Sequence, residues 1–213
     1  MAGTITGLQA QKRNPKRVNV YLDGTYAFPL DLAVAMQEGL RRGQELSDAD
    51  IARLTAADDA EKAYNRALAL LSYRPRSTAE VRRNLEGKKT PPHVVDQVIR
   101  RLTASGLLDD AAFARVWVEN RAAFSPRSAR LLGYELRQKG VAANDIDTAL
   151  SVDDQASALE AARRRARAYA RLDHDGFRRK LLPFLQRRGF GYEDATNAVE
   201  TVWREIHTES FGT

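Results

Sequence analysis

The 213-residue chain contains no cysteine, which excludes disulfides, thiolate nucleophiles and cysteine-ligated zinc or iron–sulfur sites. It also lacks an apolar run close to the roughly 18 residues that a membrane-spanning helix needs. Its first residues do not show the charged and then apolar pattern of a secretory signal. We therefore expect a cytoplasmic protein that has no membrane partner.

Catalytic patterns are also scarce. The three histidines are far apart in the sequence, and no HExxH motif or glycine-rich phosphate loop is present. Two acidic groups, Asp109-Asp110 and Asp173-His174-Asp175, are the remaining metal candidates. Both lie where a helix is predicted to begin, and aspartate is a common helix cap that also complements the helix dipole. We expect no catalytic residue, no metal and no cofactor.

The sequence does have a repeat with a period near 50 residues. Leu85 and Leu136 are 51 positions apart, whereas Leu136 and Leu185 are 49 apart. A second set of apolar anchors keeps the same two spacings: Val95, Ile146 and Ala195. Such a period is typical of stacked supersecondary units. A regular repeat of this kind could also match the repeating subunits of a partner.

The N-terminal region differs from the rest of the chain. Apolar residues alternate with polar ones up to about residue 28, and Asp23-Gly24 is a strong hairpin signal. This pattern predicts a small antiparallel β-hairpin or meander. Asp31 is expected to cap a short helix, and Ser47 with Asp50 is expected to cap another.

From Asp58 onward the apolar residues follow helical spacing, with proline and glycine at the breaks. Short connections favour packing between sequential helices. The chain is thus predicted to be mainly α, with tandem three-helix modules in an elongated array. The expected segments are the N-terminal hairpin and short helices (1–57), module 1 (58–109), module 2 (110–152) and module 3 (153–213).

Aromatic residues divide into core and surface candidates. Trp117 and Trp203 lie on apolar helix faces and are expected in the cores, as is Phe124 at the end of its stripe. Tyr73 and Phe190 adjoin arginines, so they are candidates for stacking on bases or on a partner.

Arginines are the best candidates for binding. The net charge is +6, and Arg-Ser turns open the second helix of modules 1 and 2. Because a guanidinium pairs with carboxylate and phosphate alike, a basic stripe recurring in each module could follow a charged polymer or groove. The candidate residues for partner or nucleic-acid binding are Arg74, Arg76, Arg82, Arg83, Arg121, Arg127, Arg130, Arg178, Arg179, Arg187 and Arg188.

Four motifs in order resemble the bacterial RecX regulatory family. The likeness covers about residues 58 to 206, and the hairpin ahead of it is similar to the N-terminal extension of longer members. One departure is Ser125-Pro126-Arg127-Ser128, where the family commonly has a basic residue and glycine. The motifs are residues 67–81 (Ala-Leu-Ala-Leu-Leu-Ser-Tyr-Arg-Pro-Arg-Ser-Thr-Ala-Glu-Val), 106–114 (Gly-Leu-Leu-Asp-Asp-Ala-Ala-Phe-Ala) with Trp117-Val118 and Arg121, 135–141 (Glu-Leu-Arg-Gln-Lys-Gly-Val) and 184–190 (Phe-Leu-Gln-Arg-Arg-Gly-Phe).

The resemblance implies tandem three-helix modules and a regulatory, non-enzymatic role. It implies a partner, the RecA recombinase filament on single-stranded DNA, whose strand exchange and coprotease activities would be limited. Homologous recombination, DNA repair and the SOS response are then the cellular setting. The arginines would meet acidic filament surface, DNA phosphate (single-stranded or duplex), or both, and the protein is expected to act as a monomer.

Two other functions compete with this interpretation. A helix-turn-helix DNA-binding protein acting as a transcription regulator could use a third helix carrying Arg100-Arg101 for recognition. A magnesium-dependent nuclease could use Asp109 and Asp110, and it would cleave DNA only when the metal is present.

Overall fold

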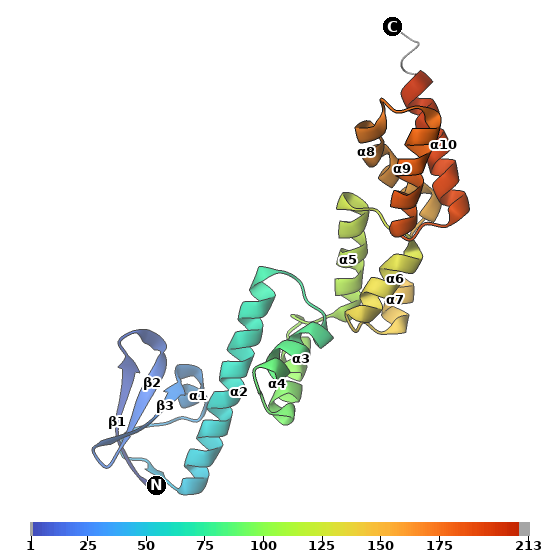
Figure 1. Cartoon of the computed structure of the whole chain (residues 1–213). Coiled ribbons are helices and arrows are strands. Elements are labelled where there is room, and N and C mark those ends of the chain that lie inside the picture. Colours follow the sequence, from blue (N-terminus) through green and yellow to red (C-terminus); the bar gives the residue numbers. More distant parts are fainter. Residues whose placement is uncertain (1, 209–213) are drawn as a thin grey trace. The chain divides into compact units, whose positions relative to one another are not determined.

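The structure is a computed structural model that describes residues 2–208. The mainly helical fold begins with an antiparallel sheet and continues as three helical modules, as predicted (Figure 1). No helix among the described residues is both long and apolar enough to cross a membrane. The elements are β1 (Gly3–Gln11), β2 (Asn14–Leu22), β3 (Thr25–Asp31), α1 (Leu32–Gln37), β4 (Glu45–Leu46), α2 (Asp48–Tyr73), α3 (Thr78–Gly87), α4 (Pro92–Ala104), α5 (Asp110–Phe124), α6 (Ala129–Gln138), α7 (Ala143–Ala149), α8 (Asp154–Ala166), the 3-10 helix η1 (Arg167–Tyr169), α9 (His174–Arg187) and α10 (Tyr192–Thr208).

The N-terminal sheet has the strand order β3-β2-β1-β4. Asp23 and Gly24 form the predicted tight turn, with φ angles of 49° and 84°, the left-handed values that a type I′ hairpin requires. Alternate residues of β2 (Val18, Val20 and Leu22) are buried, and Val20 and Leu22 pack in one core that also includes Leu54 of α2. The short fourth strand, which pairs with Gly3–Thr4, was not predicted because two residues show no alternation.

Helix α2 is longer than the sequence suggested. Its start is the predicted capping box of Ser47 and Asp50, but the helix then continues for 26 residues. Two helices were expected here, with a new one at Asp58, and this prediction is wrong. The boundary expected between residues 57 and 58 consequently falls inside α2.

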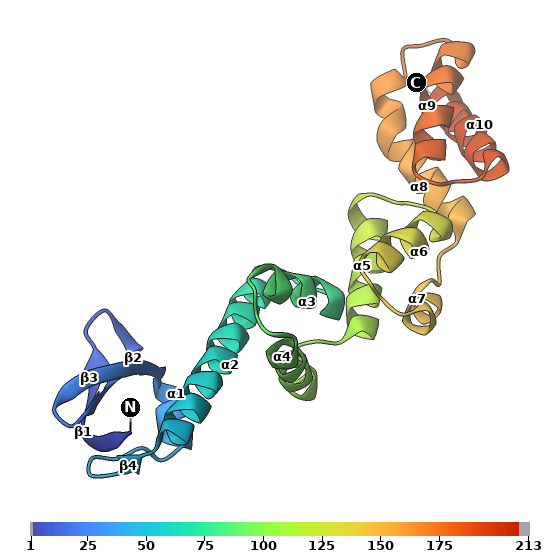
Figure 2. The ribbon, with the colours of Figure 1, turned by 60° about the horizontal axis from the view of Figure 1, so that its bottom comes forward.

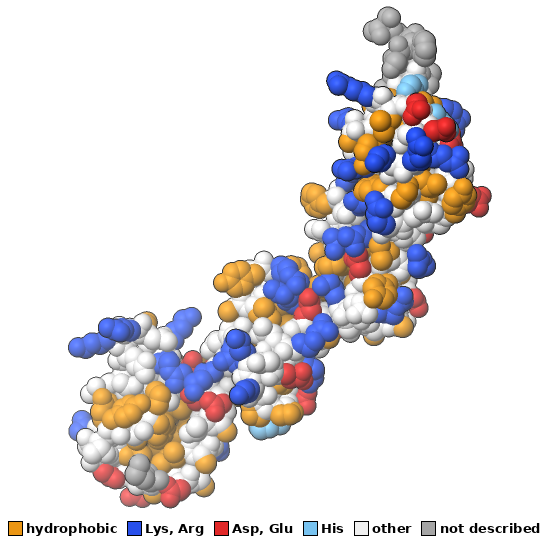
Figure 3. Space-filling view, viewed as in Figure 1, with side chains coloured by type: hydrophobic (Ala, Val, Ile, Leu, Met, Phe, Trp, Pro, Cys, Tyr) orange, Lys and Arg blue, Asp and Glu red, His pale blue; other side chains and the backbone are white. Residues whose placement is uncertain are grey.

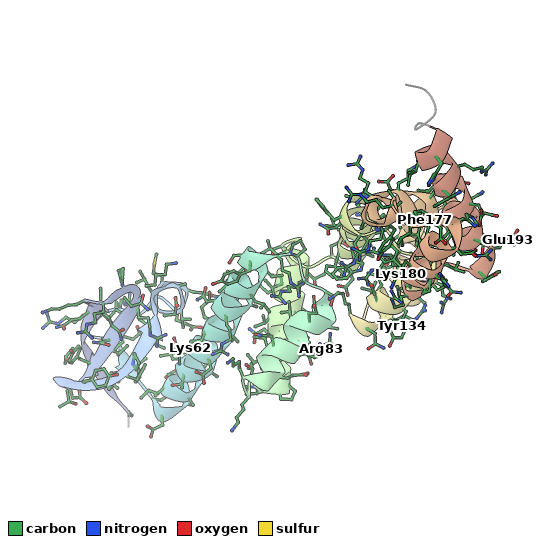
Figure 4. All side chains as sticks on the ribbon, turned by 45° about the horizontal axis from the view of Figure 1, so that its top comes forward. Lys62, Arg83, Tyr134, Phe177, Lys180 and Glu193 are labelled. Carbon is green, nitrogen blue, oxygen red and sulfur yellow. The ribbon has the colours of Figure 1, made fainter. Side chains whose placement is uncertain are left out.

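Asp58 ties α2 to the sheet instead of starting a helix. Only 2% of it is exposed, and its carboxylate accepts hydrogen bonds from the Asp31 N–H (2.6 Å) and from Arg17 (3.1 Å) while pairing with Lys62 (2.8 Å). Burial by itself would raise the pKa of Asp58, yet the hydrogen bonds from Lys62, Arg17 and Asp31 lower it overall. Figure 4 labels Lys62 on the side of α2 that meets the sheet.

Each helical module has its own small core. The first core joins α2, α3 and α4, the second α5, α6 and α7, and the third α8, α9 and α10 (Figures 1 and 2). The repeat anchors Leu85, Leu136 and Leu185 are all fully buried. The period found in the sequence is therefore a period of module cores.

Several aromatic residues lie elsewhere than expected. Trp117 and Trp203 pack against their cores, as predicted, whereas 77% of Phe124 is exposed because this last residue of α5 lies beyond the turns that contact the core. Phe190 is buried in the third core, so the prediction that it stacks on a partner is wrong. Tyr73 is 85% exposed.

The chain divides into two compact units, each of which has more contacts between its own residues than with the other unit. One comprises the residues up to Arg76 together with Val81–Leu108, and the other comprises Ser77–Glu80 together with the residues from Asp109 onward. The second unit thus holds modules 2 and 3 and also the first turn of α3. Both Arg-Ser turns contribute their serine to this unit.

Candidate interaction surface

The first Arg-Ser turn is a packing junction. Ser77 is fully buried, and its hydroxyl accepts a hydrogen bond from the Glu80 N–H (3.2 Å) while donating one to the Lys139 carbonyl (2.6 Å) at the end of α6. Lys139 also forms an ion pair with Glu80 (3.1 Å). The serine thus caps α3 and at the same time satisfies an unpaired carbonyl at the C-terminus of α6.

The second Arg-Ser turn repeats this arrangement one module later. Ser128 is fully buried, its hydroxyl accepts from the Leu131 N–H (3.2 Å), and its own N–H donates to the Arg188 carbonyl (3.1 Å) at the end of α9. Both junctions require a glycine. A Cβ at Gly140 would lie 2.4 Å from the Ala79 Cβ, and one at Gly189 would lie 2.4 Å from the Ser128 Oγ.

Acidic residues complete both junctions. Asp110 accepts a hydrogen bond from the Thr78 N–H (2.8 Å), and Asp154 accepts one from the Ala129 N–H (2.7 Å), so each carboxylate binds the first N–H of the docked helix. Asp109 caps its own helix, α5, through the Ala112 N–H (2.8 Å), as predicted. Within the described part of the chain, no cluster of three or more potential metal ligands occurs.

The second module neutralises two of its candidate arginines internally. Glu135 on α6 accepts hydrogen bonds from the Trp117 indole (2.9 Å) and from Arg121 (3.1 Å), and it also forms an ion pair with Arg127. Arg121 lies over the Trp117 ring at 4.4 Å. Burial, together with the positive charges of Arg121 and Arg188, lowers the pKa of Arg127. Two predicted binding residues, Arg121 and Arg127, thus already form ion pairs with Glu135 of their own module.

Other candidate arginines also have internal partners. Arg82 forms an ion pair with Asp96 (2.7 Å), and Arg178 donates to the Tyr192 hydroxyl (3.2 Å). Arg188 donates to the Ser125 hydroxyl (2.8 Å) and the Pro126 carbonyl (3.1 Å), within the turn that departs from the family pattern. Arg76 is half-buried. The exposed candidates are Arg74, Arg83, Arg130, Arg179 and Arg187.

The exposed cations are distributed along the whole chain. Figure 3 shows Lys and Arg side chains over the sheet and over every module on the face in view. Arg83 on α3 is labelled in Figure 4. Arg179 and Arg187 both lie on α9, whose apolar residues Phe177, Leu181 and Leu185 are buried in the module core. A regulator could therefore use cations from several modules.

Sequence reasoning missed two further cations, Arg164 and Arg165, which lie beside the predicted candidate Arg188. Arg164 and Arg165 of α8, and Arg188 just after α9, line an open cavity of about 210 Å³ together with Phe124 and Phe184. The signal was present as the run Arg163–Arg165 in an alanine-rich helix, but only the fold shows that this run meets the end of α5.

Four consecutive matches identify the family. The RecX N-terminal domain matches residues 3–47, and the first, second and third RecX three-helix domains match residues 63–102, 109–150 and 153–199. The chain belongs to the RecX family. As a RecX protein it is a regulatory protein and not an enzyme.

Curated relatives and solved structures of RecX extend over most of the chain. The regulatory protein RecX of Bacillus subtilis (strain 168) is 34% identical over 93% of this chain and 76% of its own length. That of Limosilactobacillus reuteri (strain DSM 20016) is 38% identical over 69% of this chain and 55% of its own length. A crystal structure of regulatory protein RecX superposes with a TM-score of 0.73 at 31% identity, covering 95% of this chain and 98% of that one. RecX from Lactobacillus salivarius gives a TM-score of 0.57 at 25% identity, covering 68% and 97%.

Proposed function

We propose that this RecX protein binds the RecA filament on single-stranded DNA and limits its strand exchange and coprotease activities. The observation that carries this proposal is the match of all four RecX segments in order along the chain. We further propose that it acts as a monomer in the cytoplasm, where RecA works.

The exposed arginines are the proposed filament contacts. Arg83, Arg179 and Arg187 are exposed, and none of them forms an ion pair with another described residue. Their charges are available to carboxylates or phosphates of a partner. Weak contacts made by several modules of one chain add through effective concentration, so no single strong anchor is needed.

The competing transcription-regulator function has less support in the first module. Arg101 on α4, which was considered for base recognition, forms an ion pair with Glu61 and lies over the Tyr64 ring at 3.6 Å. A guanidinium held in this way is not presented to a DNA groove. Sequence-specific duplex binding with no effect on RecA would nevertheless favour that function over the one proposed.

A RecA strand-exchange assay titrated with the protein tests the proposal. The unaltered protein should inhibit exchange and the DNA-dependent ATPase activity in proportion to its concentration. The triple variant Arg83→Glu, Arg179→Glu and Arg187→Glu should inhibit at least tenfold less, because three contacts of about 0.5–1 kcal/mol each become repulsive.

A second triple variant controls for bulk charge. Arg13→Glu, Arg41→Glu and Arg42→Glu make the same change in net charge at exposed residues of the N-terminal region. This control should inhibit RecA as the unaltered protein does. Equal weakening by both triple variants would mean that overall charge, and not these contacts, drives inhibition, and absence of inhibition by the unaltered protein would refute the function.

A further inference from the structure

The cavity where α5, α8 and α9 meet contains an unusual excess of positive charge. Arg164, Arg165 and Arg188 all line it, and Glu160, paired with Arg164 (2.7 Å), is the carboxylate that balances them among the described residues. Burial, followed by the charges of Arg164 and Arg165, lowers the pKa of Arg188. An anion entering the cavity would relieve this repulsion.

The arginines are fixed in place but retain free donors. Arg164 donates to the Ala123 carbonyl (2.7 Å), Arg165 donates from Nε to the Tyr169 hydroxyl (3.1 Å), and Arg188 uses one terminal nitrogen for its bonds to Ser125 and Pro126. A guanidinium has five N–H groups. Several donors on each arginine therefore remain available to a ligand, and their positions are set in advance.

The cavity also has aromatic walls. Phe184 lies beneath Arg188, whose guanidinium carbon is 4.5 Å from the ring centroid, and Arg165 lies 5.8 Å from the same ring. Phe124 at the rim is 77% exposed. Proteins that bind single-stranded nucleic acids combine an exposed aromatic ring with nearby arginines. The unpaired bases stack on the ring while the arginines contact the phosphates.

The repeat shows that this charge is particular to module 3. Leu136 and Leu185 are 49 positions apart, and the same spacing places Phe184 where module 2 has Glu135. Glu135 pairs with Arg121 and Arg127. In module 3 the corresponding position carries an aromatic ring, and the carboxylate that would neutralise nearby arginines is absent from that position.

We propose that this cavity binds single-stranded DNA directly, with a phosphate on Arg164, Arg165 and Arg188 and a neighbouring base stacked on Phe124. This site is separate from the filament contacts proposed above. Duplex DNA should bind less well, since its bases are already stacked within the helix and cannot reach Phe124.

Binding of fluorescein-labelled oligo(dT) to the full-length protein, measured by anisotropy without RecA, tests the proposal. Phe124→Ala should raise the Kd about tenfold, in line with the loss of one stacked base. Arg165→Glu should raise it further and reduce the steepness of the salt dependence by about one phosphate contact. Neither variant should change the circular dichroism spectrum, because both side chains are exposed.

Matched variants in the same unit serve as controls. Tyr134→Ala removes another exposed aromatic ring, on α6 (Figure 4), and Arg167→Glu reverses another exposed charge two residues from Arg165. Both should change the Kd less than twofold.

Three results would overturn the proposal: no oligo(dT) binding by the unaltered protein, equal losses in variants and controls, or equal effects of Phe124→Ala on oligo(dT) and on a duplex. Competition by polyglutamate together with full binding by Phe124→Ala would also overturn it and assign the cavity to an acidic protein segment. Since RecA is absent from these measurements, their outcome is independent of the inhibition assay.

Discussion

Helices α6 and α9 occupy equivalent places in modules 2 and 3 but begin differently. Helix α6 has 10 residues and is capped by Ser128, which is buried against the end of α9. Helix α9 has 14 residues and is capped by Asp173, which is exposed and bonds to its own Gly176 N–H (2.9 Å). When modules 2 and 3 are aligned by the 49-residue spacing, the position of Ser128 in module 2 is taken in module 3 by Phe177, a fully buried core residue.

This difference explains why the Arg-Ser turn occurs twice and not three times. The start of α3 docks on the end of α6, and the start of α6 docks on the end of α9, whereas Asp173 at the start of α9 bonds only within its own helix among the described residues. Helix α9 instead extends by about one turn and covers its own core with Phe177. The recurring turn thus has a cause within the fold, and its recurrence alone does not require a repeating partner.

The largest effect should come from filling the space at a junction glycine. Gly189 has a φ of +92°, and a Cβ there would lie 2.4 Å from the Ser128 Oγ and 2.7 Å from the Leu131 Cβ. We expect Gly189→Ala to lower the free energy of unfolding by about 3 kcal/mol, combining left-handed backbone strain with overpacking. Urea denaturation followed by circular dichroism measures this change.

A glycine with similar backbone geometry but open surroundings provides the control. Gly106 has a φ of +70°, and a Cβ there would have no atom within 4 Å. Gly106→Ala should therefore cost only the strain, about 1 kcal/mol. Equal costs at Gly189 and Gly106 would show that the close approach of α6 to α9 does not contribute to stability.

A smaller effect should follow from removing the charge of Glu135. Glu135→Gln weakens the contacts to Arg121 and Arg127 and leaves their positive charges close together. We expect a loss of about 2 kcal/mol, less than for a fully buried pair because these arginines are partly exposed. Glu119→Gln on α5, at an exposed position, should change stability by less than about 0.5 kcal/mol. A similar result for both variants would contradict the neutralising role assigned to Glu135.

Periodicity in the sequence was sufficient to predict the first three strands, the helical modules and most of their core residues. The spacing of Leu85, Leu136 and Leu185 identified three buried positions without any structure. The break expected at Asp58 was wrong because Asp58 lies inside α2, buried and paired with Arg17 of β2 as well as with Lys62. A long-range ion pair of this kind leaves no local trace in the sequence.

The candidate surface was harder to predict than the fold. Sequence alone cannot distinguish an exposed arginine such as Arg187 from one neutralised in its module, such as Arg121, because the partner Glu135 lies on another helix. The cavity residues Phe124 and Arg165 come from α5 and α8, which are separated in the sequence by α6 and α7. Their meeting depends on how modules 2 and 3 pack, which no motif encodes.

A junction serine should contribute more than a terminal cap. Ser77→Ala removes both a helix cap and the hydrogen bond to the Lys139 carbonyl, so we expect a loss of about 2 kcal/mol. Asp173→Ala removes only a cap, at a cost of about 1 kcal/mol. The difference of about 1 kcal/mol, measured by urea denaturation, estimates the contribution of the junction bond. Equal losses would mean that Ser77 acts only as a cap.

The smallest effect should come from exchanging the cap of α9, which bonds only within its own helix among the described residues. Asp173 is exposed, and its carboxylate accepts one hydrogen bond from the Gly176 N–H, a bond that a serine hydroxyl can also accept. Asp173→Ser should thus change the free energy of unfolding by less than about 0.5 kcal/mol, because Ser and Asp are similar N-caps. A loss near 2 kcal/mol would show that the start of α9 makes contacts comparable to those of α6. The two turns would then be equivalent, and the explanation for the missing third Arg-Ser turn would fail.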